Sequence, residues 1–279
     1  MKNILKIMLM MITIFTIAGS AVYAAEIPVS DQDQLITSND WTEISNLQDE
    51  MKKEEPDATI DYDKALKVYV DCNLIKLQTA DTKKLTSALE SANYVWVIPF
   101  KMEKTYGMFT VAKGLPLREE AKSVLTKAEQ EEVKNHAGKW MITEIAEHTV
   151  EPYYDILLEK REALSDCTRV VLVGSQPGMR QPVALGMDDE TARIWISLGY
   201  QYPVMKKIPE TQNVESGVYS FDSVAEISDT YIEDSEVSTG AGVQSRSSMK
   251  YVAGIGIVLI GSILILSVLK KKKIRIKFF

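Results

Sequence analysis

Two cysteines, Cys72 and Cys167, are the residues of this chain whose chemistry depends most on their surroundings. Cys72 follows an apolar stretch typical of a β-strand, and Cys167 precedes another. Their number is even, so an oxidising compartment would allow a disulfide between them. The alternative is a pair of buried free thiols, because a domain of this size does not need a covalent cross-link. Both interpretations stay open at the level of the sequence.

A cysteine can also act as a nucleophile. The stretch LSDCTRVVLVG around Cys167 has a faint similarity to the TLxTC strand of sortases, the surface transpeptidases, which pair that cysteine with an upstream histidine and a downstream arginine. The resemblance would make His136 or His148 the base. The chain departs from the pattern at Asp166, which stands in place of threonine, and at Arg169, which follows the cysteine by only two positions. Sortases are also β-barrels, which the helix-rich pattern of this chain does not indicate.

Metal ligands are few. Two histidines cannot supply a histidine-rich site. The run Asp188-Asp189-Glu190 could chelate calcium, although an acidic turn between two strands is the more common use of such residues. We therefore expect no metal and no other cofactor, and we identify no set of nucleophile, base and orienting residue that would assign catalysis.

The elements that must position these residues alternate between helix and strand. Helices are expected at 40–53 with Asp40 as N-cap, at 81–90, at 118–135 with a break near Thr126, and at 152–164. Strands are expected at 65–71, 94–100, 106–112, 139–146, 169–174, 182–187 and 192–199. This pattern predicts an α+β domain, in which helices lie on one face of a mainly antiparallel sheet. The order strand, helix, strand, strand occurs at 65–112 and again at 139–187.

Both ends of the chain have the composition of membrane-targeting segments. Residues 1–24 combine an early basic region, an apolar core and small residues before the end, which predicts a signal peptide cleaved after Ala24. An uncleaved anchor is the alternative. Near the other end, Tyr251 to Leu269 is a run of 19 uncharged residues. As a helix it would be roughly 28 Å long, which matches a bilayer core. We expect a transmembrane helix over 250–269 and a basic cytoplasmic tail over 270–279, anchored by Lys270, Lys271, Lys272 and Lys273.

The chain between these ends divides by composition into three parts. Residues 25–39 are polar and expected to be loose. Residues 40–209 carry the apolar pattern of one extracytoplasmic domain. Residues 210–249 hold eight acidic residues, one arginine and no leucine or tryptophan, so they are expected to form an acidic flexible stalk. Within the stalk, VYSFDSV (218–224) alternates like a strand that could dock on the domain.

The charge of the exported part limits its partners. All 39 acidic residues lie between Ala25 and Met249, whereas two of the 32 Lys and Arg residues precede this part and seven follow it. That leaves 23 cations against 39 acids, a net charge of −16, which excludes nucleic acid as a partner.

These observations together predict a single-pass protein of the cell membrane, most naturally of a Gram-positive bacterium, with its acidic α+β domain outside. The expected function is binding or assembly. The expected partners are the lipid bilayer and another envelope protein, a peptide or a glycan. Two alternatives stay open, an envelope enzyme that is thiol-dependent or metal-assisted, and a structural protein anchored to the cell wall.

The wall-anchored alternative makes a testable difference at the C-terminus. A wall-sorting signal consists of LPxTG, a span and a basic tail, but here the stretch before the span reads EVSTG (236–240), with Glu and Val in place of Leu and Pro. Without the fixed φ of that proline, recognition by a sortase should be poor. We expect the mature protein to begin at Ala25 and to keep its span, which mass spectrometry of both termini will check. A chain that ends at Thr239, or is linked there to wall peptide, would contradict this.

Overall fold

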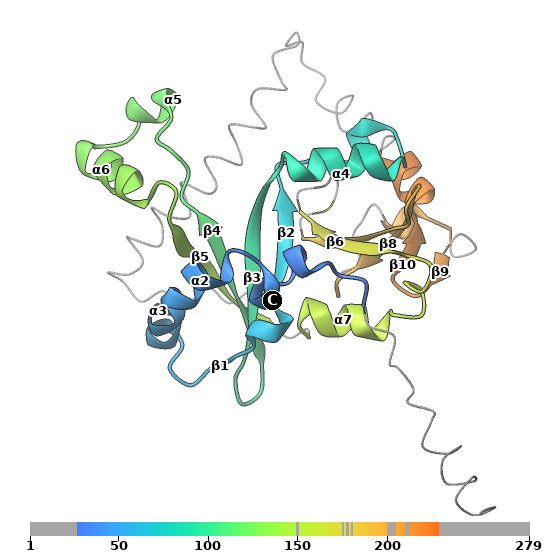
Figure 1. Cartoon of the computed structure of the whole chain (residues 1–279), viewed down its shortest axis with the longest axis horizontal. Coiled ribbons are helices and arrows are strands. Elements are labelled where there is room, and N and C mark those ends of the chain that lie inside the picture. Colours follow the sequence, from blue (N-terminus) through green and yellow to red (C-terminus); the bar gives the residue numbers. More distant parts are fainter. Residues whose placement is uncertain are drawn as a thin grey trace, which may run out of the picture.

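The computed structural model describes residues 27–148, 151–174, 176, 179, 181–199, 205–209 and 213–228. They form an α+β fold with a mostly antiparallel sheet and a few helices (Figure 1). Within these ranges, no helix has the length and apolar character needed to cross a membrane. The expected signal peptide, the expected span from Tyr251 to Leu269 and the lysines at 270–273 lie outside the described residues.

One sheet of ten strands organises the domain, in the order β5-β4-β3-β2-β6-β7-β8-β10-β9, with β1 paired to β3. Along this order the strands pair antiparallel, apart from β2 and β6, which are parallel. The strands are β1 (Thr59–Ile60), β2 (Leu66–Val70), β3 (Asn93–Lys101), β4 (Tyr106–Lys113), β5 (Trp140–His148), β6 (Arg169–Val173), β7 (Val183–Met187), β8 (Ala192–Ser197), β9 (Asn213–Glu215) and β10 (Val218–Ser220).

The helices are short. They are α2 (Trp41–Ile44), α3 (Gln48–Glu54), α4 (Thr82–Glu90), α5 (Glu119–Lys122), α6 (Lys127–His136) and α7 (Tyr153–Glu159), and residues 221–228 are also helical. Turns of 3-10 helix form η1 (Asp31–Asp33), η2 (Leu35–Thr37), η3 (Ser45–Leu47), η4 (Tyr62–Lys64), η5 (Ile75–Leu77) and η6 (Met205–Lys207). The expected helix start at Asp81 and the expected break near Thr126 are confirmed. The Asp81 side chain accepts hydrogen bonds from the backbone at the start of α4, and Thr126 forms a capping box with Glu129 where α6 begins.

Helices cover both faces of the sheet. Alternate residues of a strand point to opposite faces. Val171 packs in one hydrophobic cluster with Leu85 of α4, and Leu172 packs in another with Leu157 of α7. Figure 1 shows α4 and α7 on opposite sides of the sheet. The expectation of helices on one face is therefore wrong. All five residues of β7 are buried, and a strand that is apolar at consecutive positions needs cover on both sides.

The sheet order also differs from a simple repeat. Strands β2, β3 and β4 are neighbours, as expected for the first strand-helix-strand-strand unit. In the second unit, β5 pairs with β4 at the edge of the sheet instead of lying beside β6. Between β4 and β5, α5 and α6 form an arm that projects from the sheet (Figure 1). At its base, Gly114 lies so close to the backbone of His136 that a side chain at this position would collide with it.

Residues 27–35, here called the N-terminal strap, fill the fork where β2 and β6 separate. The two strands pair at only two positions. Beyond them, Val29 bridges Val170 of β6, and Gln34 bridges Leu66 of β2. The Val170 N–H also donates to the carbonyl of Pro28 at 2.8 Å. The strap is therefore packed, in contrast to the expected loose segment over 25–39, because it buries the side chains of Ile27, Val29 and Leu35.

The folded part also extends past the expected border at 209. β10 pairs with β8, which confirms the strand expected within VYSFDSV. Val218, Phe221 and Val224 are buried in the clusters that pack on the sheet. Residues 213–228 therefore belong to the domain, and of the expected stalk only 229–249 remains, outside the described residues.

A buried carboxylate, Asp33, holds the strap in the fork. Its side chain is 2% exposed. It accepts hydrogen bonds from the Tyr69 hydroxyl at 2.7 Å, the Ser30 hydroxyl at 2.6 Å and Nη2 of Arg169 at 3.0 Å. The ammonium of Lys67 lies 3.7 Å away. We call these five residues the Asp33 network. It joins the strap to β2 through Lys67 and Tyr69, and to β6 through Arg169.

Replacing Asp33 by Asn should destabilise the domain, because the partly buried cations of Lys67 and Arg169 would then lose the carboxylate that they share. We expect the free energy of unfolding to fall by about 3–5 kcal/mol. The measurement is urea unfolding of the full-length protein in detergent micelles, followed by the fluorescence of its four tryptophans. Asp31→Asn is the matched control, since Asp31 is exposed, and should change stability by less than about 0.5 kcal/mol. Equal effects of the two substitutions would show that the network is not a structural tie.

Candidate functional site

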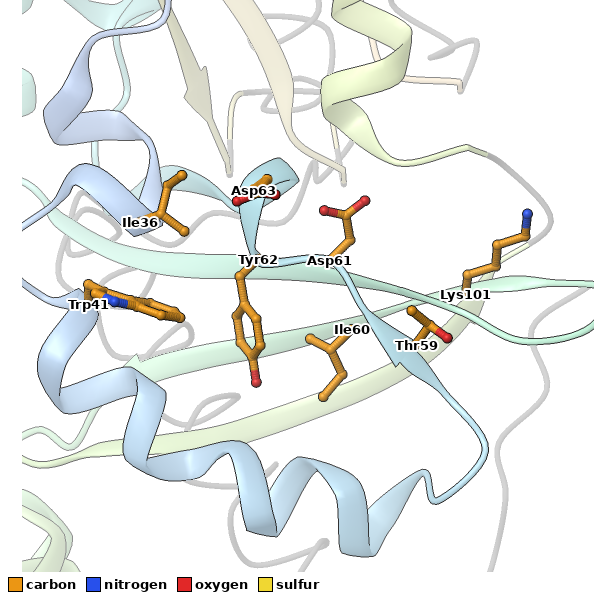
Figure 2. Close-up of a pocket in the computed structure, with 8 residues that line it drawn as sticks. All are labelled: Ile36, Trp41, Thr59, Ile60, Asp61, Tyr62, Asp63 and Lys101. Atoms are coloured by element: carbon orange, nitrogen blue, oxygen red, sulfur yellow. The ribbon is translucent and has the colours of Figure 1, made fainter.

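An open groove lies on the surface where η2, α2, β1, η4 and the end of β3 meet. Its volume is about 520 Å³, within the range of ligand-binding sites. Figure 2 shows the eight side chains that line it, which are Ile36, Trp41, Thr59, Ile60, Asp61, Tyr62, Asp63 and Lys101. Elements that are separate in sequence thus contribute to one concave surface.

One side of the groove is apolar and aromatic. The rings of Trp41 and Tyr62 meet edge to face, with their centroids 5.2 Å apart. Ile36, which is 38% exposed, and Ile60, which is half-buried, also line the groove. Burial also raises the pKa of Tyr62, whose hydroxyl lies 3.8 Å from the sulfur of Met51. This side therefore offers packed rings and aliphatic surface to a ligand.

The other side is acidic. In Figure 2 the carboxylates of Asp61 and Asp63 lie across the 59–63 backbone from the ring of Tyr62. Lys64 lies 3.7 Å from Asp61 but 2.8 Å from Asp155, so Asp155 is its closer partner. The hydrogen bond that Lys64 donates to Asp155 is the main reason that the pKa of Lys64 is raised. Asp63 is exposed and has no ion-pair partner among the described residues. At least one carboxylate of the groove is thus free to meet a cation.

Asp40, a carboxylate that does not line the groove, fixes the position of the neighbouring Trp41. It accepts hydrogen bonds from the Tyr94 hydroxyl at 2.8 Å and from Nε1 of Trp96 at 3.0 Å. Asp40 occupies the N-cap position of α2, as expected, but its side chain makes no capping hydrogen bond to the start of the helix. The reason is competition, because two aromatic donors on β3 occupy the carboxylate instead. Asp40 therefore ties the start of α2 to the sheet.

Lys67 lies close to two carboxylates of the fold, Asp33 and Asp40. Its ammonium is 4.6 Å from the ring centroid of Tyr94 and 5.3 Å from that of Trp96. Burial lowers the pKa of Lys67, while Asp33 and Asp40 act in the opposite direction. A lysine with lowered pKa can serve as a nucleophile. Here its side chain is only 11% exposed and is enclosed by aromatic rings and acids of the fold, so we assign it to structure.

The two cysteines are free thiols in this structure, and both are buried. Cys72 packs in the cluster with α4, and Cys167 packs in the cluster with α7, on the other face of the sheet. In this structure the two cysteines are therefore not bridged, which matches the alternative of two buried thiols, and the disulfide stays a prediction. Burial raises the pKa of each thiol to about 11, which leaves little thiolate at neutral pH.

The residues of the sortase-like interpretation are not brought together as a catalytic set. Arg169 is bound to Asp33. His136 ends α6 on the projecting arm, with Nδ1 2.9 Å from the carbonyl oxygen of Glu132. His148 is the last residue of β5, and its side chain is not described. Cys167 is also protonated and buried, so these positions do not support transpeptidase chemistry.

The acidic run after β7 forms a turn. Oδ1 of Asp188 accepts the backbone N–H groups of Glu190 at 2.8 Å and Thr191 at 2.6 Å. The hydrogen bond from Thr191 is the main cause of the lowered pKa of Asp188. Asp189 accepts from the hydroxyl of Thr168 at 2.9 Å. Where the structure describes the chain, no group of three or more His, Cys, Asp or Glu residues could hold a metal ion.

Sequence reasoning missed both the groove and the Asp33 network. For the network, the signal was Lys67, a cation flanked by Leu66 and Val68 inside an otherwise uncharged strand. Such a lysine needs a buried counter-charge. For the groove there was no motif, because Ile36, Trp41 and Tyr62 meet only in the folded chain.

Both thiols should react with a thiol reagent only after unfolding. At pH 8 a group with a pKa of about 11 is almost fully protonated, and the protonated form is unreactive. We expect no rapid colour with Ellman's reagent in the native full-length protein, and two thiols per chain in guanidinium chloride. Cys72→Ser should reduce the second count to one. A count of zero in denaturant, restored to two by a reductant, would show that the disulfide forms after all.

Comparisons with known proteins give no further guide to the site. Neither the models of protein families, nor the curated proteins, nor the solved structures include a match to this chain. No relative therefore assigns a role to any of these residues, and the role of the groove follows from its geometry alone.

Proposed function

We propose that this protein is an exported, single-pass membrane protein that binds a partner of the cell surface through the groove formed by η2, α2, β1 and η4. The observation that carries the proposal is the groove itself. It combines a packed aromatic pair, the partly exposed side chain of Ile36 and, in Asp63, a carboxylate with no ion-pair partner among the described residues. Concave surfaces with apolar walls and a few polar groups are typical of binding sites.

The alternative of a thiol-dependent envelope enzyme loses support. A reactive cysteine is partly exposed and lies in electropositive surroundings. Cys72 and Cys167 are instead buried among apolar side chains, and burial is the largest cause of their raised pKa. Neither cysteine lines the groove.

The location rests on the composition of the two chain ends. A signal peptide over 1–24 would export the domain, and a span over 250–269 would retain it at the membrane. The tail over 270–279 would stay in the cytoplasm because it is basic. The acidic surface of the domain suits the outer side, because the anionic headgroups of the cytoplasmic leaflet would repel it.

A photo-crosslinking residue in place of Ile36 tests binding through the groove. We expect an intact cell that carries the full-length variant to yield a covalent adduct after irradiation, because Ile36 is exposed and lines the groove. The same residue in place of Val124, which is 82% exposed on the α5–α6 arm, is the control and should yield little adduct.

Two further observations decide the outcome of this experiment. Protease added to the intact cells should release the adduct from the membrane fraction, since the domain is expected outside. Equal adducts at positions 36 and 124, or adducts at neither, would rule out the groove as the binding site.

A further inference from the structure

We infer that the ligand of the groove is an extended peptide in which an apolar residue is neighboured by arginine or lysine, an inference that rests on the proposed function. The two sides of the groove have different chemistry. Trp41 and Tyr62 lie on one side of the 59–63 backbone, and Asp61 and Asp63 lie on the other (Figure 2). Successive side chains of an extended peptide point in opposite directions, so neighbouring residues can reach both sides.

Charge favours a cation on the acidic side. Asp63 has no cationic partner among the described residues, and Lys64 is held mainly by Asp155. The groove's own cation, Lys101, lies at one end of the lining beyond Thr59 (Figure 2), and its ammonium lies over the ring of Tyr106. The exported part as a whole carries a net charge of −16. Complementary charge steers a basic ligand to such a surface and disfavours an acidic one.

The apolar side favours a peptide over a glycan. A sugar ring can stack on an aromatic face, but its rim carries hydroxyl groups that need polar partners. Ile36 and Ile60 present aliphatic surface beside the two rings, and aliphatic surface cannot satisfy a hydroxyl. An apolar side chain, by contrast, gains from burial against all four residues. A basic neighbour in the peptide would then lie toward Asp63.

The edge of β1 offers a further reason for an extended ligand. β1 pairs with β3 along one edge, and no described strand pairs with its other edge. Peptides commonly add to a free strand edge, where the backbone gives affinity and alternate side chains give specificity. β1 is only two residues long, so the side-chain contacts must supply most of the selectivity.

The test compares three labelled octapeptides whose polar residues are cationic, anionic or neutral. They alternate Leu with Arg, Leu with Glu, or Leu with Gln, and their binding to the full-length protein in a neutral detergent is followed by fluorescence anisotropy. We expect the Arg peptide to bind roughly tenfold more tightly than the Glu peptide, with the Gln peptide between them. Asp63→Asn should reduce this ratio by about threefold.

Matched variants separate the groove from the general acidity of the domain. Asp166→Asn removes the same charge from an exposed position outside the groove and should leave the ratio unchanged. Ile36→Ser should weaken all three peptides by about threefold without unfolding the protein, because Ile36 is partly exposed.

Several results would overturn the inference. Equal binding of the Arg and Glu peptides would do so, as would an equal effect of the substitutions at Asp63 and Asp166. Tighter binding of a neutral oligosaccharide such as chitohexaose would replace the peptide by a glycan. If the cross-link at position 36 still forms in cells, these results reject only the peptide, and the proposed binding function stands. If that cross-link is absent as well, both fail.

Discussion

The ion pairing of Asp33 is the interaction on which the rest of this fold depends. Strands β2 and β6 are parallel neighbours that pair at only two positions, and the strap supplies the missing backbone partners beyond them. Unpaired backbone groups at the centre of a sheet would be costly, so the strap has to stay in place. A buried carboxylate that meets two cations and two hydroxyls achieves this, because removing the carboxylate would leave both cations without a counter-charge and both hydroxyls without an acceptor.

The Asp33 network also positions part of the groove. The chain passes from Asp33 directly to Ile36 of η2 and then to Trp41 of α2, which form part of the apolar wall. Asp40 adds a second attachment, one residue before Trp41, through Tyr94 and Trp96. Two carboxylates that never touch a ligand thus hold the residues that would. A ligand in the groove binds the folded state and must therefore also stabilise the strap against release.

The local elements of this fold were predictable, and their long-range pairing was not. Helix starts at Asp81 and Thr126 follow from capping chemistry that involves only three or four neighbouring residues. The strap was mistaken for a loose segment because its composition is mostly polar. Only three of its apolar residues are buried, and Asp33 is buried although it is charged. The unbroken apolar run of β7 was a sequence pattern that indicates helices on both faces of the sheet. No local pattern, however, indicates that β5 joins β4 at the sheet edge or that β2 lies beside β6.

The position of β10 bears on how a displayed domain would reach its ligand. β10 lies between β8 and β9, and the helical residues 221–228 after it pack on the core. If the proposed span over 250–269 holds, 21 residues, 229–249, would connect it to the domain, in place of the 40 of the expected stalk. A fully extended chain of that length spans about 70 Å. Its reach falls further if the chain coils, and a short tether raises the effective concentration of partners in the same membrane. The proposed function thus favours a ligand that is itself part of the envelope over one that diffuses freely outside it.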